Sequence, residues 1–227
     1  MELVKRLKSD KFKRRLTGVL IFGALYLLAF AWMEQRDVRI HLIRMEIDRK
    51  IPFCEYFIIP YLLWFFFVAA TVLYFALFCE DDREYYKLVT TLAIGMVLFV
   101  IISYVYPNGH NLRPKLSGDS IFIRMVQILY KVDTPTNILP SLHVFNSIAC
   151  GIALLKNRKV KQHRVLCAAI VVLAVSIVLS TVLLKQHSML DVLVAFMMNL
   201  VCYGVIYVKE DARHMRQAQR MWVRKEM

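Results

Sequence analysis

The sequence has 227 residues, a net charge of +13, a mean hydropathy of +0.51 and 59% hydrophobic residues. A soluble domain of this length is about half apolar, so this composition with repeated apolar runs excludes an ordinary soluble domain and predicts a membrane protein. The Lys and Arg residues cluster at the ends of the apolar runs. That placement favours a role in membrane orientation over nucleic-acid binding, which we do not expect.

Residues 1–15 carry seven Lys and Arg residues and predict a segment that lies along a membrane surface. The first apolar run, Leu16–Met33, is 18 residues long, which is near the minimum for a spanning helix. Glu34–Pro52 is polar and predicts an exposed connection. Tyr56–Cys79 and Leu88–Tyr106 are the second and third apolar runs.

Residues 107–133 form a longer polar loop whose apolar positions from Ile121 to Leu129 predict a short amphipathic helix at the membrane interface. Pro140–Leu155 is the fourth apolar run. It is short for a span, so we expect Thr136–Leu139 to extend it. Two further runs follow, Val165–Leu184 and Val192–Val208.

The predicted fold is therefore all-α: a polytopic membrane protein with six transmembrane helices over residues 16–208. A basic N-terminal segment, residues 1–15, and a tail, residues 209–227, flank this domain. With six spans, one side of the membrane receives twenty Lys and Arg residues and the other receives ten. The positive-inside rule then places both termini in the cytoplasm.

Five scattered cysteines form no CxxC pair, so the sequence predicts neither a disulfide framework nor a zinc site. The stretch Leu184–Asp191 is more informative, because it interrupts two apolar runs with ionisable groups. Such groups cost about 2.5–3.5 kcal/mol each at a bilayer centre, which makes a functional site the default hypothesis. If a helix starts after Leu184, His187 and Asp191 lie at positions i and i+4 within side-chain reach.

The predicted topology places Arg113, His143 and Lys185 on the same, outer membrane face as His187 and Asp191. Two imidazoles, a carboxylate and cationic groups suit phosphoryl transfer without a metal. One histidine would attack phosphorus while the carboxylate orients it, and the other would protonate the leaving oxygen.

The predicted phosphate-binding groups include the start of the fourth run. Pro140 suits the first turn of a helix, and the free amides of Ser141 to His143 would then face an anion.

Three pieces of the chain resemble the signature of the type 2 phosphatidic acid phosphatase superfamily, which is written KxxxxxxRP, PSGH and SRxxxxxHxxxD. They are Asn111-Leu112-Arg113-Pro114, Pro140-Ser141-Leu142-His143, and Ser180-Thr181 with His187 and Asp191. Leu139 to His143 and Lys185-Gln186-His187 further resemble the branch of inositol phosphorylceramide synthase-like proteins and bacterial lipid phosphatases. The resemblance covers roughly residues 51 to 208.

By motif position, the resemblance implies His187 as nucleophile, Asp191 as its partner and His143 as general acid. It also implies that Arg113 and the Ser141–His143 region, Leu142 included, bind phosphate.

The chain departs from the signature at three positions. Tyr106 replaces the Lys of the first motif, Thr181 replaces the Arg of the third, and Leu142 replaces the Gly of PSGH. Lys185 or Lys115 could supply a missing cation, although a Lys ammonium cannot reproduce a guanidinium fork. An anchor at the helix end is the alternative role for Lys185.

Two other polar residues are candidates for the site. His110 lies near Arg113 in sequence and is a candidate substrate contact. Asn146 lies one turn after His143, where it could support the histidine or make an interhelical hydrogen bond.

We therefore expect a lipid phosphate or diphosphate phosphatase that acts at the outer membrane face through a phosphohistidine, with no metal or cofactor. Expected substrates are phosphatidate, lysophosphatidate or polyprenyl diphosphates, and small size with short loops favours a bacterial plasma membrane. One alternative is a headgroup transferase of the inositol phosphorylceramide synthase type. Another is a lipid-phosphate binding or transport protein without turnover. The sequence does not choose between hydrolysis and transfer to an alcohol.

Overall fold

The computed structural model describes residues 2–208, and side chains from residue 4 onward. The predicted tail, residues 209–227, lies outside the described residues. In chain order the elements are α1 (Glu2–Lys8), α2 (Asp10–Glu34), β1 (His41–Leu42), α3 (Glu46–Lys50), η1 (Glu55–Phe57), α4 (Ile58–Phe78), α5 (Asp82–Val105), β2 (Asn108–Gly109), α6 (Ile121–Val132), α7 (Leu142–Lys156), η2 (Val160–Gln162), α8 (Arg164–Leu183), α9 (Met189–Cys202) and the π-helical η3 (Tyr203–Val208).

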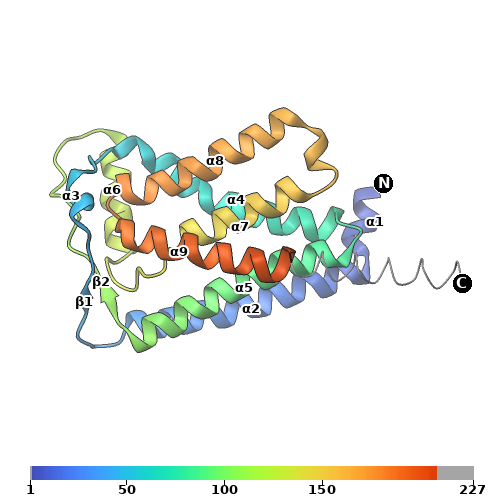
Figure 1. Cartoon of the computed structure of the whole chain (residues 1–227), viewed down its shortest axis with the longest axis horizontal. Coiled ribbons are helices and arrows are strands. Elements are labelled where there is room, and N and C mark those ends of the chain that lie inside the picture. The colour runs from blue at the N-terminus through green and yellow to red at the C-terminus, as the bar shows by residue number, and fades with distance from the viewer. Residues whose placement is uncertain (1, 209–227) are drawn as a thin grey trace, which may run out of the picture.

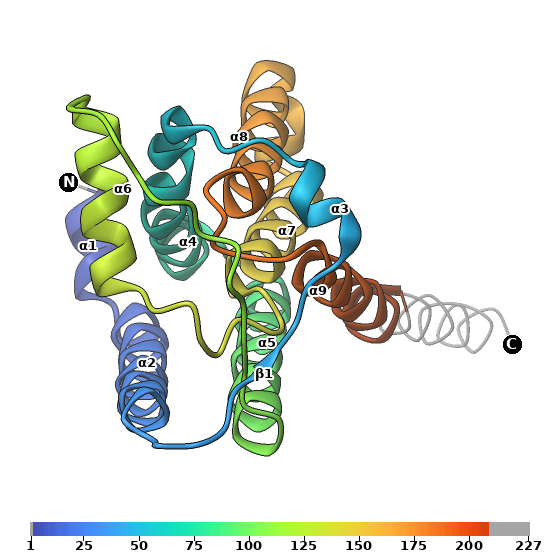
Figure 2. The ribbon, with the colours of Figure 1, turned by 90° about the vertical axis from the view of Figure 1, so that its left-hand side faces the viewer.

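The long helices run lengthwise through the molecule, and the short elements gather at its ends (Figure 1). At one end lie α3, α6 and the two short strands, which Figure 2 shows crossing the ends of the helices. At the other end lies α1 (Figure 1). The two ends of the molecule therefore carry different short elements, and the long helices connect them.

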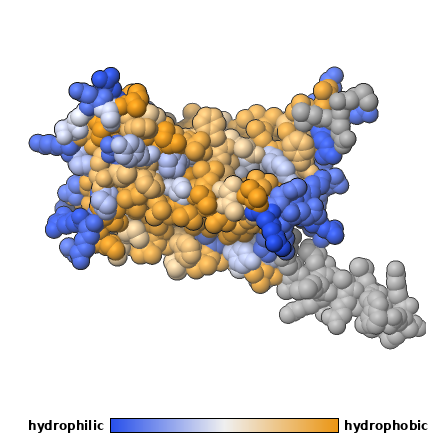
Figure 3. Space-filling model, turned by 90° about the horizontal axis from the view of Figure 1, so that it is seen from above, coloured by the Kyte–Doolittle hydropathy of each residue, from blue (hydrophilic) through white to orange (hydrophobic). Residues whose placement is uncertain are grey.

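Among residues 2–208, five helices are long and apolar enough to cross a membrane: Asp10–Glu34, Glu55–Phe78, Asp82–Val105, Arg164–Leu183 and Met189–Val208. Their outward faces expose large apolar side chains, and Figure 3 shows an apolar middle between hydrophilic ends. The predicted all-α polytopic membrane protein is confirmed. The count of six spans stays a prediction, because the remaining apolar helix, Leu142–Lys156, is shorter.

The short helix α7 has 15 residues and lies at the centre of the bundle, packed against α4, α5, α8 and α9. Ten of its residues are buried, so little of it faces lipid. Gly95 of α5 permits this packing, because a Cβ there would lie 2.2 Å from a ring carbon of Phe145. The expected extension of this helix by Thr136–Leu139 is wrong. The amides of Ile138 and Leu139 instead donate to the side-chain oxygen of Asn108 at 3.0 and 2.9 Å.

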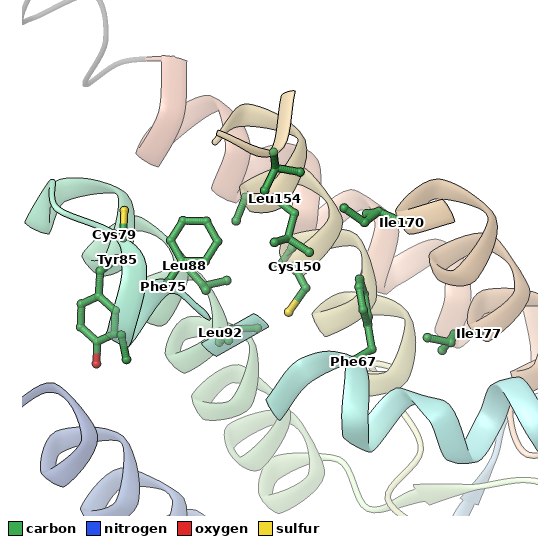
Figure 4. Close-up of a cluster of buried hydrophobic side chains, with 14 of the residues drawn as sticks. Phe67, Phe75, Cys79, Tyr85, Leu88, Leu92, Cys150, Leu154, Ile170 and Ile177 are labelled. Atoms are coloured by element: carbon green, nitrogen blue, oxygen red, sulfur yellow. The ribbon is translucent and has the colours of Figure 1, made fainter. Parts of the chain in front are cut away.

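The main core joins α4, α5, α7 and α8 through side chains that interdigitate between the helices (Figure 4). Labelled members are Phe67, Phe75, Cys79, Tyr85, Leu88, Leu92, Cys150, Leu154, Ile170 and Ile177. All five cysteines are free thiols in the structure.

The predictions for two polar segments need correction, and the predicted helix in a third is confirmed. The segment 34–52 is not simply exposed, because Ile43 and Asp48 are buried and β1 pairs in parallel with β2. Residues 1–15 are not a segment separate from the first span, since α2 already starts at Asp10 after its cap, Ser9. The predicted amphipathic helix in the 107–133 loop is confirmed as α6, whose buried side includes Ile123 and Val126.

Candidate active site

His187 and Asp191 meet where the chain turns from α8 into α9. Lys185 adopts a positive φ of 53° in this turn, and Ser188 caps α9. The Asp191 Oδ2 accepts a hydrogen bond from the Ser188 amide at 2.9 Å and lies 3.3 Å from His187 Nδ1. The expectation that both residues lie on one helical face is wrong, since His187 precedes the helix. The pair forms because Asp191 is the acidic member of a capping box.

His143 lies in the first turn of α7, beside aromatic side chains of α4. Its ring centroid is 4.3 Å from that of Tyr61 and 4.1 Å from that of Trp64. The ring centroids of His143 and His187 are 5.9 Å apart. A reacting group needs about 3–3.5 Å to each partner, so this separation accommodates a single phosphoryl group between the imidazoles.

Arg113 lies in the segment before α6 and points toward the turn that carries His187. Its Nη1 donates to the Tyr130 carbonyl at 3.1 Å, and its Nη2 donates to the Asp133 carbonyl at 2.7 Å and to the Gln186 side-chain oxygen. Its guanidinium carbon also lies 4.4 Å from the Tyr130 ring centroid. Burial lowers the pKa of Arg113 from its ordinary value. The guanidinium is thus fixed beside the residue that precedes His187.

The N-terminus of α7 faces the same region, although not as the sequence predicts. Pro140 precedes the cap Ser141 and is not part of the first turn. The Ser141 amide donates to the Asp191 carbonyl at 3.4 Å, while its hydroxyl accepts from the Val144 amide at 3.4 Å. The amides of Leu142 and His143 have no partner within the helix, because the first N–H groups of a helix never do.

The side chain of Leu142 packs away from the two histidines, in a cluster with Met33 and Phe99. The residue that replaces the motif glycine therefore offers the site its backbone amide alone.

The two predicted substitute cations are not brought to the histidines. Lys185 Nζ donates to the Asp48 carbonyl at 2.7 Å and to the Ile51 carbonyl, so it anchors the segment that carries α3. Burial lowers its pKa. Lys115 is exposed in the loop before α6, and within residues 4–208 it makes no hydrogen bond or ion pair.

The three weaker candidates lie in different surroundings. Tyr106 is exposed, with its ring stacked 4.6 Å from that of His41. The Thr181 hydroxyl donates to the Val178 carbonyl within α8 at 2.7 Å. Asn146 is buried one turn below His143, and its Oδ1 has no partner among the described residues.

His110 is buried and holds the backbone of the active-site turn. Its Nε2 lies 2.9 Å from the Gln186 carbonyl, and its Nδ1 accepts from the Leu112 amide at 3.1 Å. These two partners require a neutral ring with the proton on Nε2. Burial lowers the pKa of His110 to about 4, which agrees with that tautomer. His110 thus positions Gln186.

The sequence analysis missed Asp48, a buried carboxylate of α3 that reaches the start of α9. It accepts hydrogen bonds from the Ser188 hydroxyl at 2.6 Å, the Met189 amide at 2.8 Å and the Met45 amide at 2.7 Å. No motif signals this contact, because 140 positions separate Asp48 from Ser188 and 141 separate it from Met189. Gln186, which joins Arg113 to His110, was also missed.

Buried polar atoms without a partner gather at this site. Among the described residues, nine buried side-chain nitrogen or oxygen atoms make no hydrogen bond. Six of them belong to the residues described above: Trp64 Nε1, Arg113 Nε, His143 Nε2, Asn146 Oδ1, Gln186 Nε2 and Asp191 Oδ1. Such atoms are rare in folded proteins, and a concentration of them indicates a place for a polar ligand.

Comparison with protein families gives a match to the family described as the PAP2 superfamily, over residues 113–214. Comparison with curated proteins and with solved structures found no significant match. Members of the superfamily are phosphoesterases and phosphotransferases, in agreement with the predicted enzyme class. The match begins at Arg113, so it includes the Arg-Pro end of the first motif and the whole of the second and third motifs, and it confirms the predicted superfamily for residues 113–214.

Proposed function

We propose that this protein is a membrane-embedded lipid phosphatase that cleaves a lipid phosphate or diphosphate through a phosphohistidine at His187. The observation that carries the proposal is the convergence of His143, His187 and Asp191 in a buried site. Unpartnered polar atoms surround these residues. The superfamily match supplies the general reaction class.

In the first step, His187 Nε2 attacks the phosphorus atom of the substrate. Asp191 faces Nδ1, so it holds the ring with Nε2 directed at the substrate and stabilises the positive charge that develops on the ring. A nitrogen–phosphorus bond forms as the bond from phosphorus to the leaving oxygen breaks. His143 gives its proton to that oxygen, which departs as the lipid alcohol from a monophosphate and as the lipid monophosphate from a diphosphate.

In the second step, water attacks the phosphohistidine. His143, now neutral, removes a proton from this water as the oxygen–phosphorus bond forms and the nitrogen–phosphorus bond breaks. Inorganic phosphate leaves and both histidines return to their starting states. Arg113 and the amides of Leu142 and His143 stabilise the phosphoryl oxygens, since phosphoryl transfer depends mainly on positioning and electrostatics.

The substrate would enter from the outer membrane face, where the lysine and arginine distribution places this end of the bundle. Phosphatidate, lysophosphatidate and polyprenyl diphosphates are the proposed substrate classes. Each combines an apolar tail with a terminal phosphate. Such a molecule can keep its tail in lipid while its phosphate reaches the buried histidines.

A phosphoenzyme experiment tests this mechanism. Purified protein is mixed with ³²P-labelled phosphatidate or polyprenyl diphosphate, quenched in alkali and analysed for an acid-labile label. We expect a label in the wild type and in His163→Ala, whose residue is exposed between η2 and α8, and none in His187→Ala. Label retained by His187→Ala would contradict the nucleophile. Binding of substrate without label or phosphate release by the wild type would instead support a binding or transport protein.

The same intermediate could transfer its phosphoryl group to an alcohol. A hydroxyl placed where the attacking water would lie gives a phosphotransferase, and in this reading the chain resembles the inositol phosphorylceramide synthase branch. Adding ceramide or a small alcohol to the assay separates the two activities. A phosphorylated acceptor identifies a transferase, whereas free phosphate alone identifies a phosphatase.

A further inference from the structure

A cavity lies at the end of the bundle opposite the histidines, among α1, the start of α2 and the end of α4 (Figure 1). Its volume is about 650 Å³. Four cations line it, Lys5, Arg6, Lys11 and Arg15, together with one carboxylate, Glu80. Phe12, Ala76 and Leu77 supply apolar wall. A cavity that is basic on one side and apolar on the other suits an amphipathic anion.

The carboxylates at this cavity are already engaged. Asp82 pairs with both Lys11, at 3.0 Å, and Arg15. Glu80 pairs with Lys159 at 3.4 Å. Among the described side chains that line the cavity itself, four are cations and one is a carboxylate. This surplus of positive charge attracts an anion.

The depth of the cavity fits a lipid headgroup. It lies where α4 ends at Phe78 and α2 begins at Asp10, so it is level with the ends of the apolar spans. Basic pockets between transmembrane helices at this depth recognise anionic headgroups. Leu73 and Phe66 lie one and three turns before Leu77 on the same face of α4, and their exposed apolar side chains give a surface along which acyl chains can lie.

We propose that this cavity binds the headgroup of an anionic phospholipid from the leaflet at the α1 end. The bound lipid would join α1 and α2 to the end of α4 and stabilise the bundle. It would not be a substrate, because the cavity lies at the opposite end from His187. This proposal does not depend on the catalytic mechanism.

The test measures thermal unfolding of the purified full-length chain in a neutral detergent during titration with short-chain phosphatidylglycerol or phosphatidylcholine. We expect saturable stabilisation by phosphatidylglycerol, weakened by salt. We expect little effect of phosphatidylcholine or of glycerol phosphate, which lacks acyl chains. Equal stabilisation by both phospholipids would overturn the proposal, and full stabilisation by glycerol phosphate would identify a soluble anion as the ligand.

Matched variants locate the binding. Lys5→Gln/Lys11→Gln removes two cations that line the cavity, one on α1 and one on α2. Lys8→Gln/Lys13→Gln removes two exposed cations from the same helices outside it. We expect the first pair to weaken phosphatidylglycerol binding by about 20- to 30-fold, and the second by less than about threefold. Equal weakening would mean general attraction to the basic segment and would overturn the site.

A cavity-filling variant tests the site without removing any charge, in case the charge variants do not fold. Leu77→Trp enlarges a side chain that lines the cavity while leaving every charge in place. We expect it to keep its unfolding midpoint without lipid and to lose the shift caused by phosphatidylglycerol. An undiminished shift in this variant would overturn the assignment of the headgroup to this cavity.

Discussion

Two buried arginines mark the two ends of this bundle, and their partners differ. Arg15, at the α1 end, donates to the carbonyls of Phe75, Ala76 and Cys79 and pairs with the carboxylate of Asp82. Arg113, at the histidine end, donates to two carbonyls and an amide oxygen and makes no ion pair within residues 4–208. Arg15 therefore satisfies carbonyl groups at the C-terminal end of α4. Arg113 brings a guanidinium that makes no ion pair within residues 4–208 to Gln186, in the turn that carries His187.

This difference shows how one residue type serves structure at one end and chemistry at the other. A guanidinium with a carboxylate partner is satisfied, so its removal should mainly affect folding. A guanidinium that lacks an anionic partner in a buried site can gain one when substrate binds. Substitutions at the Arg113 end should therefore reduce activity and those at the Arg15 end should reduce stability, with the largest effect at His187.

Replacing His187 with Ala should cause the largest loss. Removing a covalent nucleophile leaves water to attack the substrate directly, so phosphate release should fall by about 10⁴- to 10⁶-fold. Release of phosphate from the purified variant, measured on the best wild-type substrate, checks this. The thermal midpoint should stay near that of the wild type. A comparable loss in His163→Ala, whose side chain is exposed, would contradict the specific role of His187.

Exchanging each arginine for Met should distinguish the catalytic role of Arg113 from the structural role of Arg15. For Arg113→Met we expect kcat/KM to fall by about 10²- to 10³-fold, because one phosphate-binding group is lost. For Arg15→Met we expect a loss of about 2–3 kcal/mol in unfolding free energy, because the carbonyls at the end of α4 lose a charged donor. Kinetics and denaturant unfolding of both variants check this crossover. Equal effects of the two variants on activity would break the comparison.

Replacing Asp48 with Ala should lower kcat by about 10- to 100-fold with little change in KM. This residue touches no proposed reacting atom, but it fixes Ser188 and Met189 at the start of the helix that carries Asp191. A small displacement of that helix would misalign His187. Steady-state kinetics of Asp48→Ala and Asp48→Asn check this, and the amide should rescue part of kcat. A variant that loses only stability would show a purely structural role.

How far the sequence predicts this site depends on the kind of residue. His143, His187 and Asp191 could be predicted because their chemistry is specific. In addition, the number of apolar runs between them predicts that they lie on the same face of the membrane. Asp48 could not be predicted, since its role depends on a contact between residues 48 and 188 that no local pattern signals.

The role of Lys185 could not be predicted from the sequence for a different reason. Its position beside His187 favoured phosphate binding, yet its ammonium turns to two carbonyls of the α3 segment. Side-chain direction in a tight turn depends on the backbone, here a positive φ of 53° at Lys185, and sequence spacing does not reveal it. The apolar runs predicted the C-terminal ends of α2, α4, α5 and α8 to within one residue, whereas α2 and α5 start six residues before their runs. The start of α7 also differs from the start of its run, because the cap Ser141 fixed it.

The smallest predicted effect concerns pH and the buried His110. Its pKa is lowered to about 4 by burial, from an ordinary value of 6.5. The unfolded chain therefore binds a proton between these values while the folded chain does not. Stability from this residue is complete above pH 6.5 and declines as the pH falls toward 4, by about 2 kcal/mol between pH 7 and pH 5.

The variant His110→Gln tests this pH dependence, because an amide can donate to the Gln186 carbonyl but does not titrate. Unfolding free energies of the two proteins, measured in detergent from pH 7 to pH 5, should converge as the pH falls. Parallel curves would show that His110 does not control the pH dependence. Convergence would show that the turn before His187 keeps its shape through a neutral imidazole. The histidine end would then lose order in acid before the Arg15 end, whose contacts with carbonyls and a carboxylate do not depend on a histidine.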